Sequence, residues 1–279
     1  MRKPVLTLLL LFVTWASVAQ ELTLPQLSQY LADNPFVMSP TYSGIGDHIK
    51  VRVNGLTQWV GIEDAPDTQS LAADARIGNR SGVGMLLYND SNGETKQRGA
   101  RLSFAHHLTL DRYDDEFLSF GISYNFNQFR IDIENFDSPD PSVTDDRRTT
   151  NHNFDVGVLY RYDNFYFSLN ASNLLEKDLT RFNPVFEPNR LRNYYIYTGY
   201  RYSKNKNSRL EIEPSVFFQL FESDGRSVTD LNTKSRWYDF EDYYYAGVTY
   251  RFLNDQIGSP LYIAPLVGLK KSNFYFGYS

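Results

Sequence analysis

Histidines and acidic side chains are the groups in this sequence that could do chemistry. The four histidines are His48, His106, His107 and His152. His106 and His107 are neighbours in an alternating, extended segment, so their side chains face opposite sides and cannot share a metal ion. His106 could be the base of a lipid hydrolase with Ser103 nearby, but no residue pattern marks an oxyanion site. We therefore expect no catalytic residue and no enzyme activity.

An acidic stretch between Ile131 and Thr150 invites a calcium-binding interpretation. It holds Asp132, Glu134, Asp137, Asp140, Asp145 and Asp146. Their spacing lacks the alternating acids, the glycine and the closing glutamate of an EF-hand loop. Arg147 and Arg148 follow directly and partly neutralise the acids. The pattern favours a solvated loop over a metal site, and nothing else in the sequence predicts a cofactor.

Charge and cysteine content exclude further classes of site. The 28 lysines and arginines stand against 33 aspartates and glutamates, a formal net charge of −5, which argues against a nucleic-acid partner. The chain has no cysteine. Disulfides, thiolate metal sites and cysteine nucleophiles are therefore impossible.

The elements that must position these residues are strands. Around residue 120, Phe120, Ile122 and Tyr124 alternate with small polar residues, and similar alternation recurs along the chain. The chain also has 21 tyrosines and 20 phenylalanines at a mean hydropathy of −0.45. Alternating strands rich in aromatic residues are typical of an all-β, antiparallel transmembrane β-barrel of the outer membrane. We expect strands over residues 48–60, 67–77, 80–89, 95–110, 116–130, 151–162, 164–172, 191–202, 208–222, 227–238, 242–252, 260–269 and from 273 onward.

Loop lengths predict the orientation of this barrel. Even-numbered connections such as 78–79 and 163 are short, and the odd-numbered set includes the long segments 131–150 and 173–190. Outer-membrane barrels have short periplasmic turns and long outer loops. We expect the long set to face outside, with no exception to this parity. Trp59 and two tyrosine-rich stretches, 194–197 and 243–245, are interpreted as interfacial girdle residues, with a sugar-binding platform as the alternative.

The N-terminal region has two parts. Residues 1–19 have a basic start, a short apolar run and small residues before position 20, which predicts a secretory signal peptide. Residues 20–47 hold Pro25, Pro35 and Pro40, which disfavour a long helix or a paired strand. This arm also carries many large apolar side chains, so it must pack against something. It is either a plug on the inner wall of the barrel, which spans 48–279, or a docking peptide for periplasmic partners.

The arm and the first strands also carry a resemblance to a known family. The matching residues are Pro25, Gln26, Ser28, Gln29, Tyr30, Asn34, Pro35, Pro40, Tyr42, Gly44, Gln58, Trp59, Gly61, Ala65, Pro66, Thr68 and Gln69. In this order and spacing they resemble the PorP/SprF family, outer-membrane proteins of type IX secretion and gliding in Bacteroidetes. Leu27, Ser39, Thr41 and Ser43 depart from the family pattern.

The resemblance implies a non-enzymatic accessory of type IX secretion. Its implied partners are outer-membrane lipid, the periplasmic and translocon components of that system, and a secreted adhesin cargo. A passive porin or hydrophobic-solute channel and a lipid-modifying barrel enzyme are the alternatives that the strand pattern alone leaves open.

The strand count raises an expectation about the end of the chain. Twelve strands are complete, and a thirteenth begins at Asn273. Bacterial single-chain barrels have an even strand number. We therefore expect a C-terminally incomplete chain, with roughly 25–40 residues missing from a barrel of fourteen strands.

Overall fold

The computed structural model describes residues 35–58, 60–62, 64–113, 115–131, 147–176, 192–205 and 208–279. The expected signal peptide, residues 20–34 of the arm, Trp59 and most of the acidic stretch lie outside the described residues. Six of the family-motif positions, from Pro25 to Asn34, fall in that first part of the arm.

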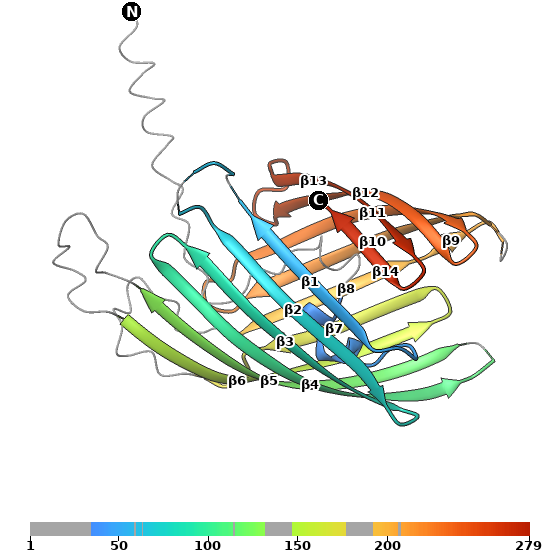
Figure 1. Ribbon diagram of the computed structural model, residues 1–279, viewed down its shortest axis with the longest axis horizontal. Coiled ribbons are helices and arrows are strands. Elements are labelled where there is room, and N and C mark those ends of the chain that lie inside the picture. The colour runs from blue at the N-terminus through green and yellow to red at the C-terminus, as the bar shows by residue number, and fades with distance from the viewer. Residues whose placement is uncertain are drawn as a thin grey trace, which may run out of the picture.

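The described chain forms one antiparallel sheet, which confirms the predicted all-β class (Figure 1). Each strand pairs with the next along the chain, except that the short β9 pairs only with β10. The strands are β1 (Lys50–Thr57), β2 (Asp67–Ile77), β3 (Ser81–Asn92), β4 (Thr95–Asp111), β5 (Glu116–Ile131), β6 (Arg147–Tyr162), β7 (Phe165–Ser172), β8 (Asn193–Tyr200), β9 (Tyr202–Ser203), β10 (Leu210–Phe221), β11 (Ser227–Asp239), β12 (Asp242–Leu253), β13 (Pro260–Lys271) and β14 (Phe274–Tyr278).

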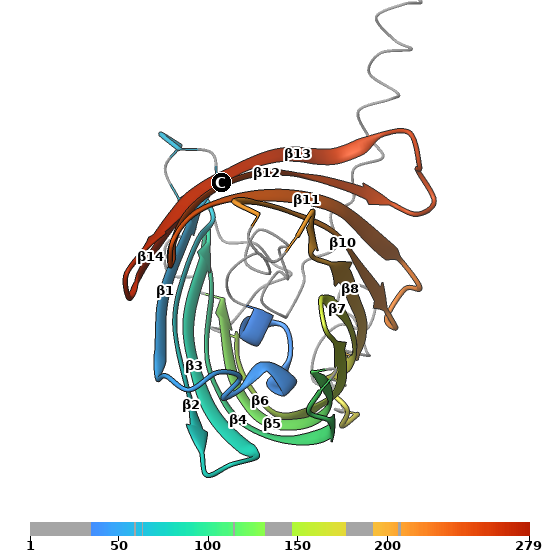
Figure 2. The same cartoon turned by 90° about the vertical axis from the view of Figure 1, so that its right-hand side faces the viewer.

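The sheet curls on itself (Figure 2). Its convex face is apolar and its concave face is largely polar. In β5, Phe120 and Ile122 are 46% and 47% exposed, whereas Ser119 and Ser123 on either side of them are buried. β6 and β7 alternate in the same way. Alternation of this kind places apolar side chains outside and polar side chains inside a rolled sheet, as the sequence predicted.

The predicted strands are found near the predicted positions, with two corrections. β6 begins at Arg147, four residues before the predicted start, so residues 147–150 belong to a strand and not to the long loop. The connection between β3 and β4 is only Gly93-Glu94, so an odd-numbered connection is as short as the even-numbered ones. Asp90, Ser91 and Asn92 were expected in a loop, but they pair with residues 95–97. Gly93 has a φ of +57°, and this left-handed conformation closes a two-residue turn.

The ends of the strand order are β1 and β14. Within the part of the chain that the structure describes, β1 pairs with β2, β14 pairs with β13, and no ladder joins β1 to β14. No helix among the described residues has the length and apolar composition needed to cross a membrane.

In the described part of the arm, two single-turn 3-10 helices precede β1. They are η2 (Pro35–Val37) and η3 (Pro40–Tyr42), and they lie inside the curl of the sheet (Figure 2). Ser39 caps η3 with its Oγ, which accepts a hydrogen bond from the amide of Thr41 at 3.2 Å. Pro40 occupies the first helical position, where its missing N–H costs nothing. Short turns started by proline thus let the arm fold compactly inside the sheet.

Candidate functional site: the seat of the N-terminal arm

The arm segment Pro35–Ile45 is seated on the concave face of the sheet by two clusters of apolar side chains. In the first cluster, Phe36 and Val37 pack with Ala72 of β2 and Leu86 of β3. Both arm side chains are almost fully buried. Burying a side chain of this size stabilises a folded protein by about 1.5–3 kcal/mol. This first cluster therefore holds the arm to the early strands.

A second cluster holds the same segment to later strands. Met38 packs with Leu159 of β6, with Tyr195 of β8 and with Phe217 of β10. Tyr42 is partly buried against both clusters. Burial raises the pKa of the Tyr42 hydroxyl above its ordinary value, so this side chain stays neutral. The segment thus bridges strands that lie far apart in the sheet order.

The second cluster corrects the girdle interpretation of the tyrosine-rich stretches. Tyr195 and Tyr197 point inward and are buried, and Tyr245 is buried on the same face. Only the alternate residues, such as Tyr194 and Tyr244, are exposed. Adjacent residues in a strand face opposite sides, so a run of tyrosines supplies both faces.

A carboxylate on the concave face of the sheet, which we call the wall, accepts a hydrogen bond from the backbone of the arm. The amide of Gly44 donates to Asp74 Oδ2 at 2.9 Å. The other carboxylate oxygen of Asp74 is 2.5 Å from Arg52 Nη1 across the β1–β2 ladder. The Asp74 side chain is fully buried, and these two partners offset the cost of removing its charge from water.

Three basic side chains of the wall donate to carbonyls of the arm. His107 Nε2 lies 2.9 Å from the Ser43 carbonyl, so this nitrogen carries the proton, and Nδ1 faces the Ser119 hydroxyl at 2.8 Å. Arg101 donates to the Val37 carbonyl and Lys50 to the Ile45 carbonyl. The wall therefore recognises the path of the arm backbone as well as its side chains.

Glycines on the wall create the space for this close approach. A β-carbon on Gly84 would lie 2.5 Å from the Phe36 ring, and one on Gly121 would lie 2.6 Å from the Thr41 nitrogen. Both distances are shorter than real β-carbons make, so any larger residue would displace the arm. The two-residue alternation of the strands gave these glycines no role of their own. The repetition of glycine at inward positions of β3, β5 and β6 was the sequence signal that could have predicted this close contact with the arm.

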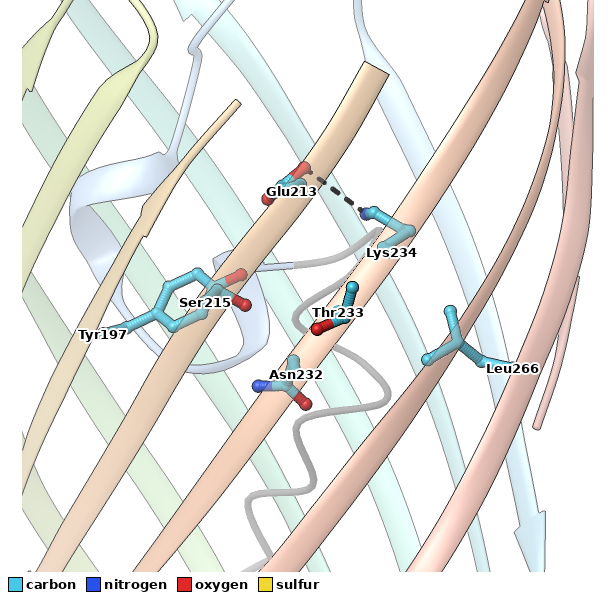
Figure 3. Close-up of a pocket in the computed structure, with 7 residues that line it drawn as sticks. All are labelled: Tyr197, Glu213, Ser215, Asn232, Thr233, Lys234 and Leu266. Carbon is cyan, nitrogen blue, oxygen red and sulfur yellow. Dashed lines mark ion pairs between the residues drawn. The ribbon is translucent and has the colours of Figure 1, made fainter. Parts of the chain in front are cut away.

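A small recess lies on the same concave face, between residues of β8, β10, β11 and β13. It is lined by Tyr197, Glu213, Ser215, Asn232, Thr233, Lys234 and Leu266 (Figure 3). Lys234 Nζ is 3.9 Å from Glu213 Oε2, and Arg236 approaches the same oxygen at 2.6 Å. This part of the wall is polar and charge-paired, in contrast to the apolar seat of the arm.

The structure separates the predicted family-motif residues into two groups. Pro35, Pro40, Tyr42 and Gly44 come together in the seated segment. The second group, Gln58, Ala65, Pro66, Thr68 and Gln69, lies at the far end of the β1–β2 hairpin.

Contacts in the second group are local. The Gln58 amide donates to the Pro66 carbonyl at 2.9 Å, and Thr68 Oγ1 donates to Asp90. Gln69 is exposed and donates to Asp67. These contacts shape this end of the sheet and do not involve residues 35–47, the described part of the arm.

The residues of the hydrolase alternative do not come together. Ser103 is buried on the concave face with His107, whereas His106 points to the opposite side and bonds Ser81 Oγ at 3.0 Å. Alternation along β4 forces this separation. His152 faces the Tyr124 hydroxyl at 2.5 Å. Among the described residues, no group of three or more histidines and acids is placed to hold a metal ion.

Comparison with known proteins gives the family. A comparison with curated proteins found no match. The family model described as "Type IX secretion system membrane protein PorP/SprF" matches residues 19–279, which is nearly the whole chain and includes the seated arm and every strand. The earlier resemblance is thereby confirmed, and the chain belongs to the PorP/SprF family of type IX secretion system membrane proteins.

Proposed function

We propose that this protein is a non-enzymatic outer-membrane component of type IX secretion that assists export or surface attachment of specific cell-surface proteins, such as gliding adhesins. Membership of a secretion-system membrane family supports the role. The apolar convex face of the sheet supports a location in lipid. Its partners would be outer-membrane lipid, periplasmic and translocon components of the system, and the adhesin cargo.

The seat of Pro35–Ile45 is the observation that carries the mechanistic part of the proposal. The segment is buried on the concave face, so few of its side chains are left for a partner to contact. It would therefore act as a plug rather than as a docking peptide. A plugged barrel suits an accessory of secretion, because it can sit in the membrane without leaking solutes.

Orientation follows from the turns at the two ends of the sheet. Connections such as 78–80 and 163–164 are short, and the opposite end carries the long segments 132–146 and 173–192. With short turns in the periplasm, the seated arm enters from the periplasmic side. The long loops would then face the surface, where exported proteins are attached.

Deletion of the gene tests the proposed function. We expect one or a few surface proteins to be retained inside the cell, while uptake of small solutes is unchanged. Complementation with the intact gene should restore the surface proteins. Slower uptake with a normal set of surface proteins would instead support the passive channel.

A further inference from the structure

Four basic side chains gather on the concave face at the short-turn end of the sheet. They are Lys50 of β1, Arg76 of β2, Arg161 of β6 and Arg201, which directly follows β8. We call them the basic mouth. Lys50 pairs in register with the buried Asp74, and Arg161 is two residues beyond the buried Leu159. Because side chains alternate along a strand, all four share the inner face.

These four cations influence one another. Arg161 is in the electrostatic field of Arg76 and Arg201, and Lys50 is in the field of Arg161 and Arg76. Like charges on a partly enclosed face repel, and an anion placed among them relieves the repulsion. The arrangement therefore favours the approach of further negative charge.

Nearby carboxylates supply only part of that charge, and Asp115 is the one whose field reaches Arg161. Asp74 is used by Arg52 and by the Gly44 amide. Asp47 is exposed and pairs with Arg76 at 2.7 Å. Glu213 is 3.7 Å from Arg201, but Arg236 approaches the same carboxylate oxygen at 2.6 Å.

Arg161 is the centre of the mouth. Among the described residues, no carboxylate lies within ion-pair distance of it, and its buried Nε has no hydrogen-bond partner. Its guanidinium is 4.8 Å from the centre of the Phe117 ring. A guanidinium held over an aromatic ring keeps its planar donors available for a carboxylate.

We propose that the basic mouth binds an acidic segment of a partner polypeptide, whose Asp or Glu carboxylates reach Arg161 and Arg201 beside the seated arm. A lipid phosphate is the less suitable ligand, because the four cations face inward and lipid contacts the convex face. The inference rests on the proposed function for one point only, that the partner is periplasmic.

A binding assay with the purified full-length protein in zwitterionic nanodiscs tests the inference. The probe is a fluorescent octaglutamate peptide, followed by anisotropy at low salt. We expect Arg161→Gln and Arg201→Gln each to weaken binding about fivefold, and high salt to abolish it. Arg161→Lys keeps the charge but loses the planar donors, so its affinity should fall between those of the wild type and Arg161→Gln. Arg98→Gln is the matched control, because Arg98 is exposed near the opposite end of β4, and should bind like the wild type.

Two results would overturn the inference. One is equal binding by wild type, Arg161→Gln and the Arg161→Gln/Arg201→Gln double variant. The other is displacement of the peptide by glycerol phosphate but not by acetate at equal ionic strength, which would assign the mouth to a lipid phosphate. Neither result depends on secretion in cells, so failure here is distinct from failure of the proposed function.

Discussion

Gly44 of the arm and Gly82 of β3 lie in direct backbone contact. A β-carbon on Gly44 would be 2.5 Å from the Gly82 Cα, and a β-carbon on Gly82 would be 2.6 Å from the Gly44 Cα. Gly44 also has a φ of +70°, which disfavours any other residue. The two glycines therefore set how closely the arm can approach the wall.

The first prediction concerns Gly82→Ala. The added methyl meets the backbone of Ser43 and Gly44, neither of which can rotate away. We expect a loss of about 1–3 kcal/mol in the free energy of unfolding, from overpacking. Guanidinium titration in phospholipid vesicles, followed by tryptophan fluorescence, measures it. Gly55→Ala in β1 is the control, since nothing lies within 4 Å of the added atom. Equal stability of the two variants would contradict the described seat.

A second prediction concerns the arm's aromatic anchor. Phe36→Ala removes a fully buried ring from the cluster with Ala72 and Leu86. We expect a destabilisation of about 3–5 kcal/mol, measured by the same titration. Phe240→Ala is the matched control, because Phe240 is 94% exposed, and it should change stability little. A small effect of Phe36→Ala would mean that the arm is not part of the cooperative core.

The third prediction concerns the buried carboxylate. Asp74→Ala removes the acceptor of the Gly44 amide and leaves Arg52 without its ion-pair partner. We expect a loss of about 3–5 kcal/mol in the free energy of unfolding. Asp224→Ala, at an exposed pair with Arg226, should cost no more than about 1 kcal/mol. Similar costs at the two sites would show that water replaces the arm at Asp74.

The absence of cysteine makes a direct test of arm burial possible. Ser39→Cys is nearly isosteric, and Ser39 is fully buried. We expect the introduced thiol to resist maleimide in intact membranes, whereas the thiol of Ser259→Cys, at an exposed position, reacts quickly. Denaturation should then make the buried thiol fully reactive. Rapid labelling of the native Ser39→Cys protein would show that the arm leaves its seat.

The fifth prediction concerns conduction. In planar bilayers we expect no large, stable unitary currents from the intact chain, because the arm occupies the concave face. Deletion of residues 22–44 removes that obstruction and should produce such currents. The Gly55→Ala protein serves as the control for reconstitution. Large porin-like currents from the intact chain would refute the plug.

Strand positions were predictable from the sequence because two-residue alternation is a local property. The predicted strand at residues 67–77 is found as Asp67–Ile77, and β5 was placed within one residue at its end. The errors in strand boundaries occurred where the residue types are compatible with both a strand and a loop. Asp90–Asn92 are polar and typical of a loop, yet they continue β3 because Gly93 permits a two-residue turn.

The seat of the arm was only partly predictable. The density of prolines and apolar side chains indicated an irregular segment that must pack, and Phe36 and Met38 do pack. Nothing local identified their partners, because Asp74, His107 and Tyr195 come from strands far along the chain. Those contacts depend on how the sheet curls, which alternation alone does not fix.

The bridging position of the arm also has a consequence for folding order. His107 and Ser43 are 64 residues apart in the chain, and Met38 reaches still later strands through Phe217. Contacts of such long separation form only after the intervening chain has been organised. Pro35–Ile45 therefore docks late, although it precedes every strand of the sheet. Until strands β2 to β10 have assembled around it, its apolar side chains lack the partners that bury them in the folded protein.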